Sequence, residues 1–281
     1  MIANSFNTIN KPLLMGILNV TPDSFSDGGR FDSLEHALDQ CRKMISEGAD
    51  IIDVGGESTR PGSDRVDAEQ QIARVVPVIE AIRRQLATDI PISIDTTLSR
   101  VAEAALVAGA DIINDISAGE DDPAIFDLAA RSKTPIILMH RQGTPKTMQD
   151  APYYDHVVEE VLAALLTKVE SARQSGIAAE MIAIDPGIGF GKRKQDNLDL
   201  LAHLDRFAAS GYPVLLGASR KRFMGSLLDV TEPTELVTAT AVTTALGVMA
   251  GVKLFRVHDI KANRQALDVA WAIKQSVKSA T

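Results

Sequence analysis

The chain has 281 residues, of which 45% are hydrophobic and 23% charged, and its formal net charge is -8 at pH 7. This composition supplies enough apolar material for a large core and excludes an intrinsically disordered protein. The acidic balance excludes a protein that holds nucleic acid through a general basic surface, because such binding depends on displacing counterions from phosphate. We therefore expect no nucleic-acid partner, and any phosphate site must be local.

The start of the chain and its cysteine content bear on location. The first residues, MIANSFNTINKPLL, lack the basic start and apolar stretch of an export signal, and no apolar run reaches membrane-spanning length. The only cysteine is Cys41, which rules out an intrachain disulfide and a zinc cluster of the cysteine type. We expect a cytoplasmic protein with no membrane partner.

Short apolar runs rich in Ile, Val and Leu recur along the chain, and each is followed by a turn and a longer amphipathic segment. The runs are LLMGILNV (13–20), DIIDVGG (50–56), PISIDT (91–96), DIINDI (111–116), TPIILMH (134–140), MIAIDPG (181–187), PVLLGAS (213–219) and LFRVHD (254–259). Strands with such continuous apolar character belong to parallel sheets covered by helices. Eight units in 281 residues favour closure over an open sheet. The sequence predicts an α/β fold with one domain over residues 1–281, a single (β/α)8 TIM barrel.

Two glycine-rich polar segments follow the first two predicted strands, NVTPDSFSDGG at 19–29 and GGESTRPG at 55–62. At a barrel rim such segments can fold over a ligand and offer backbone N–H groups to an anion, so we expect long mobile loops after strands 1 and 2. The alternative is an ordinary turn, but the first segment is longer than a turn requires. Residues 234–251, before the last strand, are nearly all apolar, and we expect this helix to be largely buried.

Every predicted strand ends in polar or glycine residues, and in a parallel barrel these ends meet at the rim where catalytic residues lie. A single Asp or Asn at a strand end can equally serve to cap a helix, but eight polar strand ends at one rim favour a binding site. The set comprises Asn19, Asp23, Glu57, Thr59, Arg60, Asp95, Asn114, Asp115, His140, Asp185, Ser219, Lys221, Arg256 and His258.

Arg256 and His258 alternate along the last predicted strand, so their side chains point the same way. With Arg60 and the hydroxyl of Thr59 they form a candidate oxyanion pocket, since the donor fork of arginine matches phosphate. A phosphorylated substrate is the expected ligand. The alternative for Arg256 is an ion pair with a carboxylate of the rim.

Asp95, Asn114 and Asp185 come from three strands and form a carboxylate–amide–carboxylate set that suits a planar ligand with several N–H donors. Lys221 would donate to a carbonyl or ring nitrogen of the same ligand, which points to an aminated, oxo-substituted heterocycle. Metal binding is the competing use of these carboxylates, but the sequence lacks the ligand spacing of a transition-metal cage. A Mg2+ shared with substrate phosphates needs fewer protein ligands, and Asn19 is a candidate.

The motif series MGILNVTPDSFSDGG, DVGGESTRPG, SIDTT, INDI, MH-x-QGTP, DPGIGFGK, GASRKRFMG and RVHD closely resembles that of bacterial dihydropteroate synthases, in order and across nearly the whole chain. The resemblance implies a pterin-binding barrel that condenses (7,8-dihydropterin-6-yl)methyl diphosphate with 4-aminobenzoate in folate biosynthesis. Such a transferase requires Mg2+ and releases diphosphate. The resemblance also implies competition by sulfonamides for the aminobenzoate site, and a homodimer.

The resemblance further implies a role for each matching residue of the rim. The pterin diphosphate site would consist of Thr59, Asp95, Asn114, Asp185, Lys221, Arg256 and His258, and Asn19 would contact Mg2+. The 4-aminobenzoate site would consist of Phe25, Ser58, Thr59, Arg60, Pro61, Phe190, Lys221 and Arg222. The catalytic set would be Asp95, Asp185, Lys221, Arg256 and His258, with Asp23 and Asp27 as further charge partners.

Two other functions share parts of this pattern. A pterin-binding methyltransferase has the same barrel and an Asp/Asn pterin site, but it has no use for an anion pocket with Mg2+, and the intact GGESTRPG and SRK segments disfavour it. A catalytically inactive paralogue would be expected to lack loop or anion-site residues, which this chain keeps. The variable position of MH-x-QGTP is Arg141, to which the sequence assigns no function.

Overall fold

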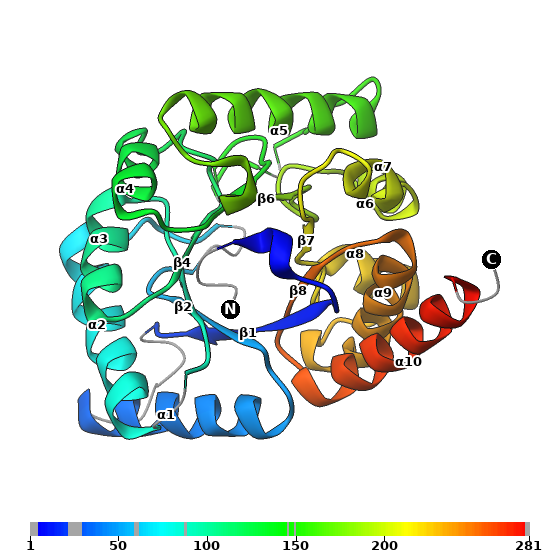
Figure 1. The fold of residues 1–281 in the computed structure, drawn as a ribbon. Coiled ribbons are helices and arrows are strands. Elements are labelled where there is room, and N and C mark those ends of the chain that lie inside the picture. Colours follow the sequence, from blue (N-terminus) through cyan, green and yellow to red (C-terminus); the bar gives the residue numbers. More distant parts are fainter. Residues whose placement is uncertain are drawn as a thin grey trace.

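The computed structural model describes residues 5–21, 30–58, 62–86, 89–144, 146–148 and 150–278. Within these residues, parallel strands alternate with helices around a central ring (Figure 1). The strands are β1 (Leu13–Asn19), β2 (Ile51–Gly55), β3 (Ile92–Asp95), β4 (Ile112–Asp115), β5 (Ile136–Met139), β6 (Ile182–Asp185), β7 (Leu215–Leu216) and β8 (Leu254–Val257). Each lies inside one of the eight apolar runs, which confirms the predicted order.

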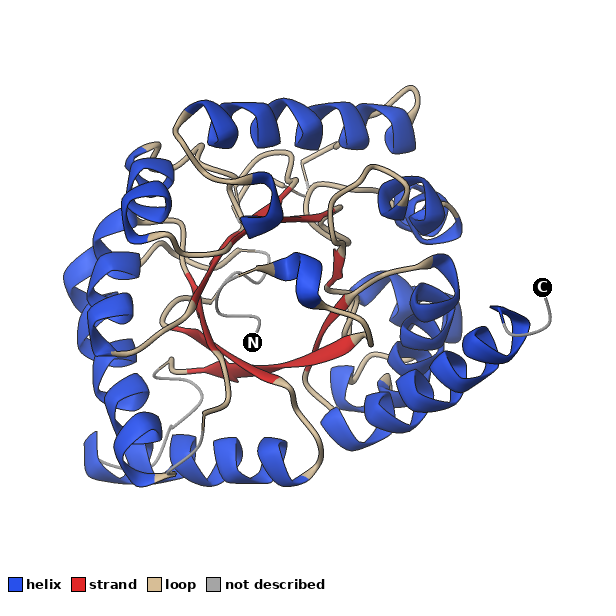
Figure 2. Cartoon of the chain, viewed as in Figure 1, coloured by secondary structure: helices blue, strands red, loops and turns tan. Residues whose placement is uncertain are grey.

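The strands form one eight-stranded sheet in the order β6-β5-β4-β3-β2-β1-β8-β7, as far as the described residues define it. The two ends of this order approach each other, because Ile184 of β6 forms a parallel bridge with Val214, just before β7. Figure 2 shows the resulting ring of strands inside an outer ring of helices. The structure is therefore the predicted (β/α)8 barrel, although β7 is only two residues long where the apolar run covers 213–219.

The covering helices follow the strands in chain order. They are α1 (Arg30–Ser46), α2 (Ala68–Gln85), α3 (Ser99–Ala108), α4 (Ala124–Ser132), α5 (Val157–Gln174), α6 (Lys194–Ala202), α7 (Leu204–Ala208), α8 (Arg222–Leu228), α9 (Val237–Ala250) and α10 (Ile260–Lys278). Short 3-10 helices occur at η2 (Phe6–Thr8), η4 (Ala179–Met181) and η5 (Pro233–Glu235). Within the described residues, no helix is both long and apolar enough to cross a membrane.

Glycine ends a helix at one of the recurring joints between a helix and the next strand. Gly109 caps α3 with φ +113°, and its N–H group donates to the carbonyl of Ala105. A left-handed backbone of this kind is open to glycine without the steric cost that a Cβ brings. The chain can therefore turn at once into β4.

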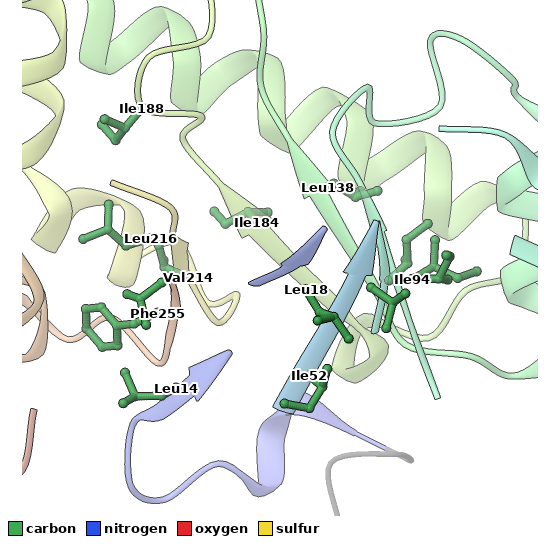
Figure 3. Close-up of a cluster of buried hydrophobic side chains, with 14 of the residues drawn as sticks. Leu14, Leu18, Ile52, Ile94, Leu138, Ile184, Ile188, Val214, Leu216 and Phe255 are labelled. Atoms are coloured by element: carbon green, nitrogen blue, oxygen red, sulfur yellow. The ribbon is translucent and has the colours of Figure 1, made fainter. Parts of the chain in front are cut away.

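Two apolar layers stabilise the barrel. The first lies between strands and helices, where alternate strand residues such as Leu14, Ile52 and Phe255 are buried (Figure 3). The second fills the inside of the barrel near the amino ends of the strands, and Phe6 and Ile9 of the N-terminal segment are part of it. The remaining members of this inner cluster are Met15, Ile51, Ile112, Ile137, Ala183, Leu215 and Leu254. The N-terminal segment thus closes one end of the barrel.

The expectation that the apolar segment 234–251 would be largely buried is wrong. In α9 the buried positions are Thr240, Thr244, Gly247 and Val248, whereas Val242 and Leu246 are 53% and 60% exposed. The side that packs on the barrel is lined by small and hydroxyl side chains because the helix approaches it closely. A Cβ at Gly247 would lie 2.6 Å from the ring of Phe255. The larger apolar side chains consequently face outward.

Candidate active site

The inside of the barrel becomes polar toward the carboxyl ends of the strands. Strand side chains alternate between the two faces, so the inner positions follow in steps of two from apolar residues such as Ile51 and Leu254. Most of the next inner positions carry polar side chains or glycine. They are Asn19, Asp53, Gly55, Ser93, Asp95, Asn114, Asp185, Gly217, Ser219, Arg256 and His258. The fold therefore brings the carboxylates and the amide predicted for the rim to one end of the barrel.

A cleft of about 600 Å³ opens at this end, and its lining is basic. The cationic or imidazole side chains along it are Lys192, Lys194, Arg220, Lys221, Arg222, Arg256 and His258. No Asp or Glu occurs among its described lining residues, which also include Asn19, Ser58, Met148, Phe190 and Ser219. A cleft with charges of one sign concentrates ligands of the opposite sign. This cleft suits substrates that carry phosphate or carboxylate groups.

Arg256 lies between two carboxylates at the base of the cleft. Its Nε donates to Oδ2 of Asp53 at 2.6 Å and its Nη2 to Oδ2 of Asp95 at 2.5 Å. Burial alone would lower the pKa of Arg256, but the two neighbouring carboxylates raise it above its ordinary value. The ion pair that the sequence left open as an alternative for Arg256 is therefore present, and the guanidinium still lines the cleft.

Asp95 and Asp185 are buried carboxyl groups whose pKa values are raised to near neutral pH. Burial raises the pKa of Asp95 to about 7, although Arg256 lowers it. Burial also raises the pKa of Asp185 to about 6, against a hydrogen bond from the backbone N–H of Gly187 and the charge of Lys221. Shifted carboxyl groups of this kind beside a cleft are typical of functional sites.

Asn114 and Asp115 are neighbours in β4 but face opposite sides. Asn114 points inward, and its Nδ2 donates to Oδ2 of Asp53 over a long 3.5 Å. Asp115 points outward, where it accepts hydrogen bonds from the backbone and hydroxyl of Ser117 and from the backbone of Gly119. Asp115 thus stabilises the turn after β4 and caps no helix, because α4 begins only at Ala124, whereas Asn114 belongs to the rim.

Lys221 and Phe190 form one wall of the cleft. The ammonium of Lys221 lies 4.1 Å from the centre of the Phe190 ring. Burial lowers the pKa of Lys221 to about 8, with Arg256 acting in the same direction. The ring of Phe190 is buried with Ile116, Met139 and Met148. Lys221 therefore has one face on an aromatic ring and lies within electrostatic reach of Asp95 and Asp185.

The loop after β6 is held against the loop after β5 by a buried lysine. Nζ of Lys192 donates to Nδ1 of His140 at 3.1 Å, to the carbonyl of His140 at 3.3 Å and to the carbonyl of Phe190 at 3.1 Å. Burial lowers the pKa of Lys192 to about 7, and it lowers the pKa of His140 to about 3. His140 is therefore a neutral acceptor that supports Lys192.

His258 lines the cleft as an uncharged ring. Its Nδ1 lies 3.0 Å from the hydroxyl of Ser219. Burial lowers the pKa of His258 to about 3, with the charges of Arg220 and Arg256 acting in the same direction. Arg220 is itself paired with Asp259, behind the cleft. An uncharged His258 can offer an anion a single N–H donor, so the positive charge of the cleft comes from its lysines and arginines.

The loop after β2 is pinned at its base by Glu57. Oε1 of Glu57 accepts from the backbone of Val66 at 3.1 Å, and Oε2 accepts from Nε2 of Gln71 at 2.9 Å. Ser58 lines the cleft between these anchors, and Arg222, the first residue of α8, lines it as well. The other residues predicted for these loops lie outside the described part of the chain; they are Asp23, Phe25, Asp27, Thr59, Arg60 and Pro61.

The surroundings of Asn19 fit a hard divalent cation. Gly55 has no side chain, and the space above it is flanked by Oδ1 of Asn19 and Oδ2 of Asp95, each 3.6 Å from the position a Cβ would take. Oxygen donors of this kind are the ligands that Mg2+ prefers. Within the described residues, no group of three or more His, Cys, Asp or Glu is placed to hold a metal ion. Any cation at Asn19 would thus share its remaining coordination with a substrate or water.

Arg141, to which the sequence assigned no function, is buried in an ion-pair network. Its side chain is 5% exposed and pairs with Asp121, which also pairs with Arg65. The network links the loops that follow β2, β4 and β5. Arg141 supports the loops around the rim and does not line the cleft.

Two residues of the site were missed by the sequence prediction. Asp53 lies in the middle of the apolar run DIIDVGG and not at its end, so a prediction based on polar strand ends did not include it. Asp53 is two residues from both Ile51 and Gly55, so strand alternation places its carboxylate inside the barrel with them. This spacing was the sequence feature that could have identified it. Lys192 ends GIGFGK, and no pattern in the sequence distinguishes a buried lysine from an exposed one.

Comparisons with known proteins agree with this geometry. Residues 15–258 match the family model described as pterin binding enzyme. The chain is 46% identical over 268 residues to the dihydropteroate synthase of Synechocystis sp., covering 95% of this chain and 92% of that one.

Two solved structures resemble the whole barrel. The Xanthomonas albilineans dihydropteroate synthase with 4-aminobenzoic acid is 44% identical with a TM-score of 0.88, covering 95% of this chain and 94% of that one. The Yersinia pestis dihydropteroate synthase in a sulfonamide drug complex is 40% identical with a TM-score of 0.89, covering 95% and 96%. This chain therefore belongs to the pterin-binding enzymes and, within them, to the dihydropteroate synthases.

Proposed function

We propose that residues 1–281 act as a single pterin-binding domain whose rim joins (7,8-dihydropterin-6-yl)methyl diphosphate to 4-aminobenzoate. The observation that supports these residue roles is the division of charge at the rim. Buried carboxyl groups, Asp95 and Asp185, lie at the strand ends, whereas the adjoining cleft is lined by basic residues. A substrate with a hydrogen-bond-donating ring at one end and a diphosphate at the other matches that division.

The pterin ring lies on the carboxylate side in this proposal. Its amino group and ring N–H groups donate to Asp95 and Asp185, and the amide of Asn114 completes the set. Lys221 donates to the ring carbonyl or a ring nitrogen. A ligand that satisfies buried polar groups is discriminated strongly from one that leaves them unpaired. This explains why the base of the site combines acceptors and a donor that are largely shielded from water.

The diphosphate lies on the basic side, where Arg256 and His258 are its nearest partners. The amine lone pair of 4-aminobenzoate attacks the methylene carbon, the carbon–oxygen bond breaks, and its electron pair leaves with the diphosphate. The amine proton is released to diphosphate or water. Positive charge that develops on the pterin methylene is stabilised by Asp95 and Asp185, and negative charge on the diphosphate by the cleft cations. Thr59, outside the described residues, completes this site through the family resemblance.

The second substrate lies between the cleft wall and the loop after β2. Phe190 and Lys221 provide the wall, and Ser58 and Arg222 approach it from two other elements. Phe25, Thr59, Arg60 and Pro61 belong to the same proposed site. A relative binds 4-aminobenzoic acid and another a sulfonamide drug. We accordingly expect sulfonamides to inhibit this enzyme in competition with 4-aminobenzoate and not with the pterin substrate.

Asn19 would hold Mg2+ in this proposal. The cation would supply further neutralisation of the departing diphosphate. We expect chelation to abolish turnover and added Mg2+ to restore it, and Asn19→Ala to raise the Mg2+ concentration needed for half-maximal rate. An unchanged Mg2+ requirement in Asn19→Ala would remove this residue from the proposal.

The decisive experiment supplies purified protein with the pterin diphosphate, labelled 4-aminobenzoate and Mg2+, and measures labelled dihydropteroate. The Asp95→Asn variant is then compared for turnover and for pterin binding. A role in stabilising transition-state charge predicts a much larger loss of turnover than of binding, whereas equal losses would contradict it. Asp115→Asn is the control, because Asp115 is also buried, on the next strand, but faces away from the rim.

We further propose that the chain forms a homodimer in the cytoplasm. The support for a dimer is a group of exposed apolar side chains on α8, α9 and α10, comprising Leu227, Leu228, Val242, Leu246, Met249, Val269, Ile273 and Val277. Of these helices, α9 and α10 pack side by side (Figure 1). Exposed apolar patches of this kind are typical of protein interfaces. Sedimentation velocity should give a dimer that Leu246→Glu converts to monomer.

For the location, the support is Cys41, a buried free thiol suited to a reducing compartment.

A further inference from the structure

The buried carboxylate of Asp53 has no part in the substrate contacts proposed above. It stands in the middle of β2, opposite Ser93 in the ladder with β3, while Asp95 stands opposite Gly55 one step nearer the rim. Asp53 is 0% exposed and does not line the cleft. Asp53 lies one step deeper in the barrel than Asp95, and its hydrogen bonds run to two side chains of the rim, Arg256 and Asn114. A contribution of Asp53 to the reaction would then act through these two side chains.

Asp53 contacts two members of the rim from beneath. Its Oδ2 accepts from Nε of Arg256 at 2.6 Å and from Nδ2 of Asn114 at 3.5 Å. Arg256 also donates to Asp95 through the other end of the same guanidinium. One guanidinium thus joins the carboxylate of Asp95, nearer the rim, to that of Asp53, one step deeper in the barrel.

The placement of Asp53 is unfavourable for stability taken alone. Its Oδ1 has no hydrogen-bond partner among the described residues, and the hydroxyl of Ser93 in the facing position has none either. Buried ion pairs can often be replaced by well-packed apolar residues without loss of stability, and an unsatisfied carboxylate oxygen adds a further penalty. The carboxylate therefore calls for an explanation other than packing, and its short contact with Arg256 provides one.

We propose that Asp53 is a positioning residue that anchors and charge-balances Arg256 while Asp95 binds the substrate ring. This proposal rests on the proposed pterin site. A ring N–H that donates to Asp95 competes with Nη2 of Arg256 for the same carboxylate. Because Nε remains bound to Asp53, the guanidinium keeps its place when that contact changes. Without Asp53, Asp95 would be the only carboxylate among the described residues that pairs with Arg256, and ring binding would have to break that pair.

The test is a double-mutant cycle between Asp53 and Arg256. Asp53→Asn keeps the shape and removes the charge, and we expect the dissociation constant of the pterin diphosphate, measured without 4-aminobenzoate, to rise about 10- to 100-fold, as when a supporting partner behind a ligand-binding side chain is removed. The KM for 4-aminobenzoate should change little. In an Arg256→Gln background, the same Asp53→Asn change should alter pterin binding less than about twofold.

Ser93→Ala is the matched control, because Ser93 faces Asp53 from the next strand and contacts neither Arg256 nor the cleft. It should bind pterin diphosphate like the wild type. Equal losses from Asp53→Asn in both backgrounds would overturn the proposal, and so would wild-type pterin binding by Asp53→Asn. If the single variant does not fold, Asp53→Asn/Arg256→Gln is compared with Arg256→Gln alone, where a tenfold further loss of binding overturns it. Synthesis of dihydropteroate by the wild type tests the proposed function separately from these outcomes.

Discussion

The ammonium of Lys221 lies over the ring of Phe190, and this contact joins the start of α8 to the loop after β6. The contact places a cation and an aromatic face on the same wall of the cleft. Phe190 is also buried in one cluster with Met139 of β5, so the wall is continuous with the strands of the barrel. A planar aromatic carboxylate can stack on such a wall while its charge lies among cations.

Replacing Phe190 with Leu should weaken 4-aminobenzoate binding through this wall. Cation–π contacts contribute about 0.5–2 kcal/mol, so we expect a KM for 4-aminobenzoate that is roughly 2- to 30-fold higher. The dissociation constant of the pterin diphosphate should change less. Steady-state kinetics with each substrate varied in turn measure both. Met148→Leu, which keeps the apolar packing and the Lys221–Phe190 pair, is the control.

The pKa of Asp185 predicts an acid limit to activity. Burial raises this pKa to about 6, so in the free enzyme the carboxyl group gains its proton as the pH falls through that value. A protonated Asp185 no longer offers a negative charge to the N–H donors of the ring, which weakens their hydrogen bonds. We therefore expect kcat/KM for the pterin substrate to fall below about pH 6. Asp185→Asn should be slower and should lose the part of the acid limb near pH 6, while the part due to Asp95, whose pKa burial raises to about 7, remains. An unchanged acid limb in that variant would assign it to another group.

The same raised pKa affects stability in the opposite sense to a paired surface carboxylate. Because the folded state holds the Asp185 proton more tightly than the unfolded chain, the group favours folding at low pH, and this contribution is lost as the pH rises through about 6. Urea unfolding at pH 5 and at pH 7 measures the change in unfolding free energy between the two pH values. This change should be smaller for Asp185→Asn than for the wild type. The Asp95→Asn variant measures the part of the change that Asp95 contributes.

Gly187 should tolerate no side chain. Its φ is +69°, and a Cβ would lie 1.9 Å from the carbonyl oxygen of His140. Gly187→Ala should therefore separate the loops after β5 and β6, lowering both thermal stability and pterin binding. Gly211→Ala is the control, because Gly211 also has a positive φ of +91° but no atom within 4 Å of its Cβ position. That variant should lose only the backbone term of about 1–2 kcal/mol. Similar melting temperatures for the two variants would contradict the prediction.

The Arg141–Asp121 pair should contribute to stability and not to substrate binding. Burial would raise the pKa of Asp121, but the bond to Arg141 and the charge of Arg65 hold it below its usual range. Arg141→Met leaves Asp121 with the hydroxyl of Thr97 and the more exposed Arg65, and should lower the unfolding free energy by about 1–3 kcal/mol. Adding Asp121→Ala should recover part of this loss. Chemical denaturation of the single and double variants measures the coupling, and KM values should stay near those of the wild type.

Much of this site followed from the sequence because strand ends in a parallel barrel share one rim. Asp95, Asn114 and Asp185 were expected there from their positions after apolar runs, and strand alternation places all three inside. The same alternation separates Asn114 from Asp115, which the sequence had grouped together. The partners of Arg256 could not be chosen in advance, since any of several carboxylates was in reach. Exposure was harder still: the apolar residues of α9 face outward because small residues let the helix approach the barrel closely.

The N-terminal segment that fills the amino end of the barrel has a consequence for the order of events. In the described part of the chain, Phe6 and Ile9 pack against the innermost strand residues, so the route to the proposed site runs through the opposite mouth. The ring of the first substrate occupies the deeper position in the proposed site, and the second substrate would cover it. In the proposed site the pterin substrate therefore binds before 4-aminobenzoate. The product leaves through the same opening by which both substrates entered.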